Sequence, residues 1–219
     1  MRRAFPKLPS YSRCIQLMPR CAVALSALFE WLKGSCSGLS IADSTALPVC
    51  RNQRIHQHKV FKGSAARGKT STGGFFGFKL HVSINHLGEW LRIKLTPGNV
   101  DDRQPSPDLW ASLFGKLYAD KGYIAQWLTQ KLQQQGITLM TKHRKNMKPS
   151  AMTPFDQAIL RRRSLIETVF DQLKKLCQIE HSRHRSIANF VVNLMAAIIP
   201  YCLAPNKPAL PISHVFQLQ

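Results

Sequence analysis

The clearest strand in the sequence reads Phe76-Gly77-Phe78-Lys79-Leu80-His81-Val82-Ser83-Ile84-Asn85. Large apolar residues alternate along it with small or polar ones, which is the two-residue period of a strand that turns one face to a core. The alternation returns at Leu91, Ile93 and Leu95, after the turn residues His86-Leu87-Gly88. The two segments therefore predict an antiparallel hairpin.

Three further strands are predicted around this hairpin. Leu39–Asp43 alternates before it, and Lys116–Asp120 and Ile137–Lys142 follow it with a polar helix, Ile124–Gln135, between them. Strands that alternate with helices in this way indicate an α/β fold.

Helices are predicted where apolar residues recur at helical spacing. We expect one over residues 20–33, packed against the sheet, a short one ending near Leu113, a long one over Phe155–Cys177, and a core helix within Phe190–Leu203. On the long helix, Arg163, Glu167, Asp171 and Lys174 would share one face, grouping two acids with two bases.

Composition points to a folded protein that binds polyanions. The chain has 219 residues, 44% of them hydrophobic, and 31 Lys and Arg against 11 Asp and Glu, a formal charge of +20. This excess makes nucleic acid the first partner to consider. The apolar run Phe190–Leu203 is shorter than the roughly 20 residues of a membrane span, and six cysteines without a C-x-x-C pair are read as reduced thiols. We expect no membrane association and no export.

Three of the eleven acids stand apart as candidate metal ligands. Asp43 and Asp120 each end a predicted strand, and Asp43 is in phase with apolar Leu39 and Ile41, while Glu167 lies on a helix beside Arg163. Carboxylates arriving from two strands and a helix suit Mg²⁺, which prefers oxygen ligands. The alternative from the residues alone is that these acids are helix caps or ion-pair partners.

Six blocks of the sequence occur together in one order along the chain: Ile41–Thr45, Arg54–Gly63, Phe75–His81, Leu95–Arg103, Ala119–Tyr123 and Ile179–Ser186. In this order they resemble bacterial insertion-sequence transposases with a DDE catalytic domain, and the insertion sequence 982 family in particular. The resemblance extends from Phe5 to about Leu203. The resemblance implies an RNase H-like fold, with a mixed five-stranded sheet flanked by helices, and double-stranded DNA as the partner.

The resemblance also implies roles for individual residues. Asp43, Asp120 and Glu167 match the three catalytic acids, which would hold two Mg²⁺ ions, with Mn²⁺ able to substitute. Arg163, Glu167 and Lys174 resemble the R-x3-E-x6-K element near the catalytic Glu, although Leu160 occupies the position where a Tyr often precedes that Arg. The implied reaction is hydrolysis of a DNA strand followed by strand transfer into target DNA.

The resemblance further implies how the chain is organised. Residues 1–37 would be an N-terminal helical segment packed on a catalytic domain of residues 38–204, with residues 205–219 as a loosely attached tail. Family members usually carry an additional helical segment in front, so we expect a truncated copy of the transposase. The alternative function is a catalytically unproductive remnant that binds DNA without sequence preference. A cytoplasmic, nucleoid-associated location is implied, and a homodimer is left open.

Basic residues outside the acid cluster predict a surface for the DNA backbone. Several flank a glycine-rich segment that we expect to be a flexible loop, and others form a run after the last strand. The predicted DNA-binding residues are Lys59, Lys62, Arg67, Lys69, Lys142, Arg144, Lys145, Arg163, Lys174, Arg183 and Arg185. His56 and His58 are read as residues of a solvated loop, with contact to phosphate or a contribution to the site as the alternative. His181 and His184 are read as part of a basic loop that faces DNA, together with Arg183 and Arg185, and metal ligation is their alternative role.

Overall fold

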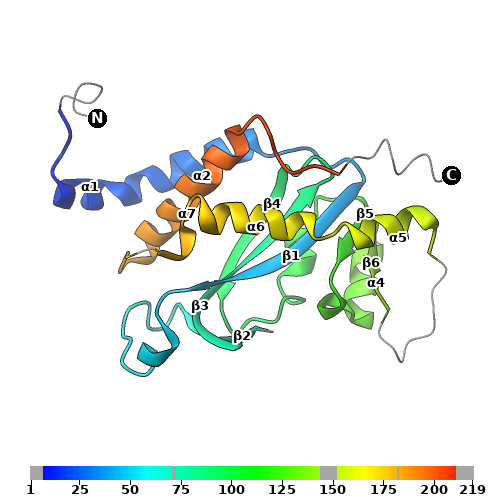
Figure 1. Cartoon of the computed structure of the whole chain (residues 1–219), viewed down its shortest axis with the longest axis horizontal. Helices are drawn as coiled ribbons and strands as arrows, with labels where there is room; N and C mark the ends of the chain where they lie inside the picture. Colours follow the sequence, from blue (N-terminus) through cyan, green and yellow to red (C-terminus); the bar gives the residue numbers. More distant parts are fainter. Residues whose placement is uncertain (1–6, 71–72, 144–151, 182, 211–219) are drawn as a thin grey trace.

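A six-stranded mixed sheet forms the centre of the structure (Figure 1). The structure is a computed structural model and describes residues 7–70, 73–143, 152–181 and 183–210. The strands run in the order β2-β3-β1-β5-β6, and β4 pairs with β3. Their bounds are β1 Leu39–Pro48, β2 Ala66–Thr70, β3 Gly73–Asn85, β4 Trp90–Pro97, β5 Gly115–Ala119 and β6 Ile137–Thr141.

The predicted hairpin forms the antiparallel half of the sheet. β3 pairs antiparallel with β1, β2 and β4. In the other half of the sheet, β5 pairs parallel with β1 on one side and with β6 on the other. The prediction of five strands was wrong because Ala66–Thr70 adds a sixth, pairing with the first residues of β3. This segment was expected to be a flexible loop, since its basic and glycine residues carry no apolar alternation.

A glycine contact fixes the register between β1 and β5. The Lys116 N–H donates to the Gly38 carbonyl at 2.8 Å, and Ile41 stands opposite Tyr118. Gly115 has a φ of +79°, and a Cβ on it would lie 2.4 Å from the Gly38 oxygen. Only glycine therefore fits this close approach of the two backbones.

Helices cover both faces of the sheet (Figure 1). On one face, Ile41, Leu80 and Tyr118 lie in a core with residues from α6 (Leu165–Lys175) and α7 (Ile187–Leu203). On the other face, Leu117 and Ala119 pack with residues near α3 (Ser106–Leu109) and α4 (Gln126–Gln134). The expectation that Pro105 and Pro107 confine this helix to a later part ending near Leu113 was wrong. α3 has Pro107 in its first turn, where proline is tolerated, and it ends at Leu109.

The predicted long helix is two helices. α5 (Pro154–Arg161) begins with Pro154 in its first turn and with Thr153 as cap, whose hydroxyl accepts from the Asp156 N–H at 3.1 Å. The chain then turns at residues 162–164, and α6 begins at Leu165. The prediction of one continuous helix over Phe155–Cys177 was wrong, because the apolar spacing continues across a turn that no proline or glycine marks.

The N-terminal segment consists of α1 (Tyr11–Leu17), a 3-10 turn η1 (Met18–Cys21) and α2 (Ala22–Leu32), and α2 packs beside α7. Phe29 is buried in the core, but Val23 and Trp31 are 81% and 79% exposed. The expectation that this helix buries its apolar residues against the sheet was therefore wrong for these two. By length and composition alone, Tyr11–Leu32 is long and apolar enough to cross a membrane, and 6% of its most apolar 18-residue stretch is buried.

Short 3-10 turns and a C-terminal contact complete the described chain. The turns are η2 (Asn52–Arg54), η3 (Lys121–Tyr123) and η4 (Ile179–His181). In the part of the predicted tail that the structure describes, the Leu210 N–H donates to the His86 carbonyl at 2.7 Å, and the Leu210 side chain is buried. Residues 205–210 are therefore attached across the turn between β3 and β4.

Candidate active site

Three carboxylates meet at one end of the parallel strands. Asp43 lies in β1, Asp120 directly follows β5, and Glu167 is in the first turn of α6. Because Ile41 stands opposite Tyr118, a step of two residues along each strand brings Asp43 beside Asp120 on the same face of the sheet. The side chains of Asp43, Asp120 and Glu167 are 20%, 56% and 61% exposed.

Arg163 joins the three carboxylates. Its Nη1 donates to Asp43 Oδ2 at 2.7 Å, and its Nη2 lies 3.6 Å from Asp120 Oδ1 and 3.4 Å from Glu167 Oε1. Arg163 stands in the turn between α5 and α6, so the break in the predicted helix is what aims its side chain at β1. One guanidinium thus links three acids that are far apart in the sequence.

Burial and charge act in opposite directions on this cluster. Burial raises the pKa of Asp43 above its ordinary value, although Arg163 and the Ser44 N–H, which donates to Asp43 Oδ1 at 2.8 Å, both favour its charged form. Burial disfavours the charge on Arg163, but the attraction of Asp43, Asp120 and Glu167 raises the pKa of Arg163 overall. The cluster is therefore held by an ion pair that is partly removed from water.

A polar layer lies behind Asp43, on the opposite face of the sheet. Ser44 Oγ donates to Asp102 Oδ1 at 2.9 Å, and Lys79 Nζ donates to the same oxygen at 3.1 Å. His81 is 2% exposed; its Nε2 lies 2.8 Å from Thr96 Oγ1, and its Nδ1 lies 3.8 Å from Asp102 Oδ1. This layer supports β1 at the residue after Asp43.

Sequence reasoning missed this layer. The sequence did not single out Asp102 among the acids, and the alternation along Phe76–Asn85 predicted a core against its apolar face only. The other face carries the polar side chains. The structure buries His81, Ser83 and Asn85 on that face, at 2%, 0% and 2% exposure. The signal was present in the hairpin itself, since a histidine and an asparagine recur in phase on one strand and Asp102 follows its partner strand.

The donor set fits a hard divalent cation. Among the residues that the structure describes, no three His, Cys, Asp or Glu side chains lie close enough to hold a metal as they stand. However, the carboxylates of Asp43, Asp120 and Glu167 already converge on one positive charge, that of Arg163. Carboxylate oxygens are the ligands that Mg²⁺ and Mn²⁺ take, so these three residues could hold such an ion.

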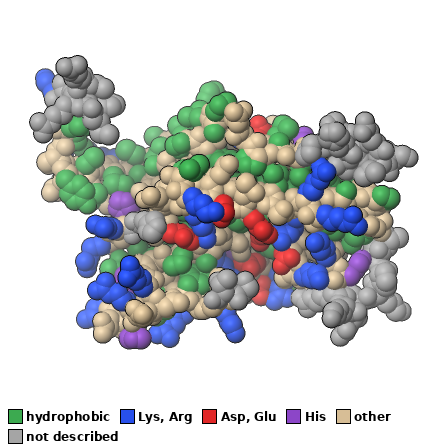
Figure 2. Space-filling view, viewed as in Figure 1, with side chains coloured by type: hydrophobic (Ala, Val, Ile, Leu, Met, Phe, Trp, Pro, Cys, Tyr) green, Lys and Arg blue, Asp and Glu red, His purple; other side chains and the backbone are tan. Residues whose placement is uncertain are grey.

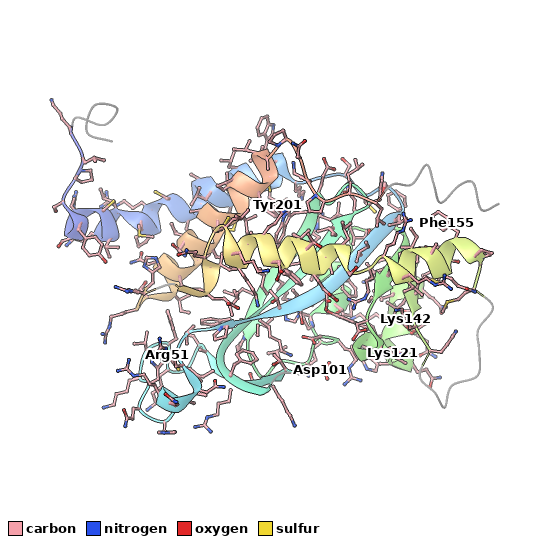
Figure 3. All side chains as sticks on the ribbon, viewed as in Figure 1. Arg51, Asp101, Lys121, Lys142, Phe155 and Tyr201 are labelled. Atoms are coloured by element: carbon pink, nitrogen blue, oxygen red, sulfur yellow. The ribbon has the colours of Figure 1, made fainter. Side chains whose placement is uncertain are left out.

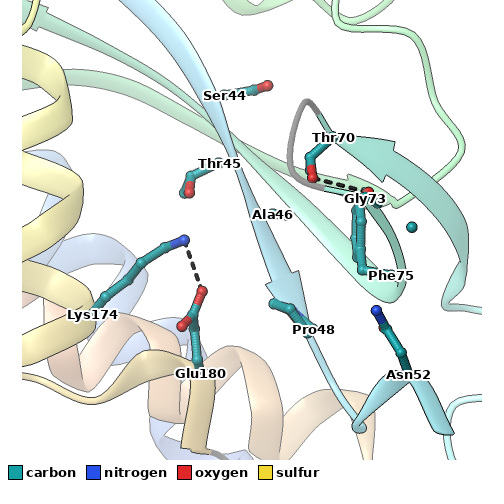
Figure 4. Close-up of a pocket in the computed structure, with 11 residues that line it drawn as sticks. Ser44, Thr45, Ala46, Pro48, Asn52, Thr70, Gly73, Phe75, Lys174 and Glu180 are labelled. Atoms are coloured by element: carbon teal, nitrogen blue, oxygen red, sulfur yellow. Dashed lines mark hydrogen bonds and ion pairs between the residues drawn. The ribbon is translucent and has the colours of Figure 1, made fainter.

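A hollow of about 400 Å³ lies along β1 (Figure 4). Its wall includes Ser44 and Thr45 of β1, Phe75 of β3, and Lys174 of α6. Lys174 Nζ pairs with Glu180 Oε1 at 2.7 Å across one side of it. Lys174 therefore does not join Glu167 and Asp171 in one group, as the sequence predicted; Asp171 pairs instead with Lys175 at 2.5 Å.

Basic side chains stand on either side of the central acids (Figure 2). Figure 3 shows Arg51 at one end of the sheet and Lys142 at the other. Arg67 and Lys69 are exposed on β2, and Arg183 is exposed before α7. Lys59, Lys62 and Arg185 border one hollow of about 400 Å³. The predicted DNA-binding residues Arg144 and Lys145 lie outside the described residues.

The histidines separate by environment. His56 is exposed after β1, whereas His58 turns its ring edge toward Phe76, with ring centroids 5.8 Å apart. His184 is partly buried, and the side chain of His181 lies outside what the structure describes.

Comparison with known proteins adds one finding. The family model for the transposase DDE domain matches residues 33–187, which include Asp43, Asp120, Arg163 and Glu167. No curated protein matches the chain.

Proposed function

The chain belongs to the transposase DDE domain family, and we propose that it cuts DNA at the ends of an insertion sequence and joins those ends to target DNA. The observation that carries this proposal is the convergence of Asp43, Asp120 and Glu167 on Arg163. These acids are the ones that the resemblance to the insertion sequence 982 family assigns to catalysis. The matched region contains all three of them.

In this proposal, Asp43, Asp120 and Glu167 are the catalytic carboxylates and hold two divalent cations, Mg²⁺ or Mn²⁺. When bound, such cations supply Lewis-acid stabilisation to the phosphate at which the strand is cut. Asp43 is the most buried of the three and is fixed by the Ser44 N–H and by its strand. Asp120 and Glu167 are more than half exposed, so DNA can reach the cluster from their side.

The chain's own basic groups would hold the DNA backbone. The segment of residues 51–70, which carries Lys59, Lys62, Arg67 and Lys69, lies at one end of the sheet, and Lys142 lies at the other (Figures 1 and 3). Lys174 and the hollow beside β1 offer a place for the nucleotides next to the cut, because Thr45, which lines the hollow, is in phase with Asp43 along β1. Contacts of this kind bind phosphates and position the duplex without reading its sequence.

We also propose that the fold is RNase H-like. Apart from β2, the sheet has the expected five strands, three of them antiparallel and two added parallel to β1. The catalytic unit would then be residues 38–204, with the N-terminal helices packed on it, acting on DNA in the cytoplasm and not at a membrane.

A nicking assay tests the proposed function. Purified protein is incubated with a supercoiled plasmid that carries the insertion sequence with both of its ends, in Mg²⁺ or in EDTA. We expect nicked plasmid with 3′-hydroxyl ends only in Mg²⁺. If the protein binds the plasmid but leaves it intact in both Mg²⁺ and Mn²⁺, the chain is the DNA-binding remnant and not an active transposase.

A further inference from the structure

The guanidinium of Arg163 lies among the three carboxylates that would bind a metal ion. Its guanidinium contacts Asp43 Oδ2 at 2.7 Å and is within 3.6 Å of a carboxylate oxygen of both Asp120 and Glu167. The Arg163 side chain is 16% exposed, and that of Asp43 is 20% exposed. Their charges therefore interact more strongly than charges in open water would.

Three carboxylates at one place repel each other unless a cation stands among them. Asp120 adds to the electrostatic cost of charging Asp43, whereas Arg163 opposes it. In the described structure, Arg163 thus fills the electrostatic role that the acids would otherwise need a metal ion to fill. A divalent cation on the same oxygens would be repelled by the guanidinium at this short distance.

We propose that Arg163 is a resident counterion of the acid cluster, which keeps the three carboxylates together before a metal ion binds and gives up Asp43 when one does. This inference rests on the proposed function, since it takes Asp43, Asp120 and Glu167 as the metal ligands. Arg163 is then a positioning residue whose charge competes with the metal. The DNA contact predicted for Arg163 becomes available only after it leaves Asp43.

The local chain allows such a movement. Arg163 lies in the turn at residues 162–164 and not inside a helix, so its side chain can change direction without unwinding α5 or α6. Asp120 and Glu167 are 56% and 61% exposed, which leaves open space on the side away from β1. The competing interpretation is that Arg163 is a permanent structural partner of Asp43, paired with it whether or not a metal ion is bound.

Metal binding in the absence of DNA separates the two interpretations. Dissociation constants for Mn²⁺ are measured by calorimetry, and melting temperatures are measured in EDTA and in Mg²⁺, for the wild type, Arg163→Gln and Arg162→Gln. Arg162 is the adjacent arginine, is exposed, and loses the same charge when changed. We expect Arg163→Gln to melt lower in EDTA, to gain more from Mg²⁺, and to bind Mn²⁺ at least threefold more tightly than Arg162→Gln. If Arg163→Gln binds Mn²⁺ no more tightly than Arg162→Gln, Arg163 is a permanent structural partner of Asp43 and the proposal is overturned.

A measurement on the wild type keeps the proposal testable if Arg163→Gln fails to fold. An arginine-specific dicarbonyl reagent modifies free guanidinium groups, and the modified residues are identified by peptide mass. We expect Mg²⁺ to increase modification of Arg163 several-fold and to leave Arg162 unchanged. Unchanged protection of Arg163 in saturating Mg²⁺ would refute the displacement. If neither the wild type nor either variant binds Mn²⁺, the assignment of the acids as metal ligands fails as well. That outcome differs from Mn²⁺ binding of equal strength in all three proteins, which would mean only that Arg163 stays on Asp43.

Discussion

Ser44 Oγ donates a hydrogen bond to Asp102 Oδ1 at 2.9 Å, and so connects the strand residue after Asp43 to an acid on the opposite face of the sheet. The same carboxylate oxygen accepts from Lys79, whose side chain is 14% exposed. Asp102 thus supports β1 from behind the candidate active site, and changing it should affect folding before it affects binding.

We expect Asp102→Ala to lower the free energy of unfolding by about 1–3 kcal/mol, because it leaves a mostly buried lysine without its carboxylate partner. Asp101→Ala is the matched control, since Asp101 pairs with Arg103 at 2.5 Å where both side chains are more than a third exposed. That change should cost under about 1 kcal/mol. Urea unfolding measures both, and equal losses would show that Asp102 has no special supporting role.

The buried His81 should make stability depend on pH. Burial lowers the pKa of His81 to about 4 from its ordinary 6.5, with Asp102 opposing that shift and Lys79 and Lys94 adding to it. As the pH falls through 6.5, the unfolded chain takes up a proton that the folded protein refuses, so stability falls until about pH 4. The loss should amount to at most about 3 kcal/mol.

His81→Gln removes that titrating group, and His56→Gln is the control at an exposed position. Melting temperatures between pH 7 and pH 4 should fall less steeply in His81→Gln than in the wild type, and equally steeply in His56→Gln. Parallel curves for all three proteins would rule out His81 as a source of the pH dependence.

The glycine contact at the start of β5 gives a prediction about backbone geometry. Gly115→Ala should destabilise the protein by about 2–4 kcal/mol, because the new Cβ would lie 2.4 Å from the Gly38 oxygen in addition to its strained φ of +79°. Gly136→Ala has a similar φ of +76° with open space around it, so it should cost only about 1–2 kcal/mol. Chemical denaturation measures the free energy of unfolding of both variants. Equal losses would mean that the close approach of the Gly115 and Gly38 backbones adds nothing to the cost of a Cβ at residue 115.

Binding to duplex DNA should weaken steeply as salt increases. Each phosphate that the protein neutralises contributes about −0.9 to the slope of log K against log salt. Changing Lys142, Arg144 and Lys145 together to Ala should reduce the magnitude of that slope by about 1–3, whereas Lys7→Ala should change it less. A slope near zero for the wild type would contradict DNA binding, and equal effects of the two variants would make residues 142–145 an ordinary solvated surface.

Neutralising one exposed acid of the cluster should leave the fold intact. Asp120 is 56% exposed, and its charge adds to the cost of charging Asp43. We therefore expect the melting temperature of Asp120→Asn in EDTA to equal or exceed that of the wild type. A drop of several degrees would show that the contact with Arg163, at 3.6 Å, outweighs the repulsion between the carboxylates.

Strand alternation is a local signal, and it predicted that Asp43 is in phase with the apolar residues Leu39 and Ile41 and that Asp120 ends a short strand. The residues alone left open whether these acids bind a metal or are ion-pair partners, and it was the resemblance that grouped them with Glu167. Arg163 was predicted to lie beside Glu167, but its reach to Asp43 depends on a turn at residues 162–164 that the apolar spacing conceals.

Other features depend on contacts that no local pattern encodes. β2 is a basic segment that becomes a strand because β3 extends beyond its pairing with β4 and offers its residues 73–77 as an edge. The polar face of β3 is buried because α3 and α4 pack over that side of the sheet. Val23 and Trp31 follow a helical apolar pattern and are nevertheless exposed, because only Phe29 of α2 is buried in the core.

The most direct test of the proposed active site compares two acids on one helix. Glu167 and Asp171 are both exposed on α6, one turn apart, but only Glu167 lies within 4 Å of Arg163 among the contacts of the described residues. Nicking of a supercoiled plasmid in Mg²⁺ is measured for Glu167→Gln and Asp171→Asn. We expect Glu167→Gln to lose at least about a hundredfold in rate, since it removes a charged metal ligand, while Asp171→Asn stays within about twofold of the wild type. Equal rates in the two variants would contradict the assignment of Asp43, Asp120 and Glu167 as the catalytic acids.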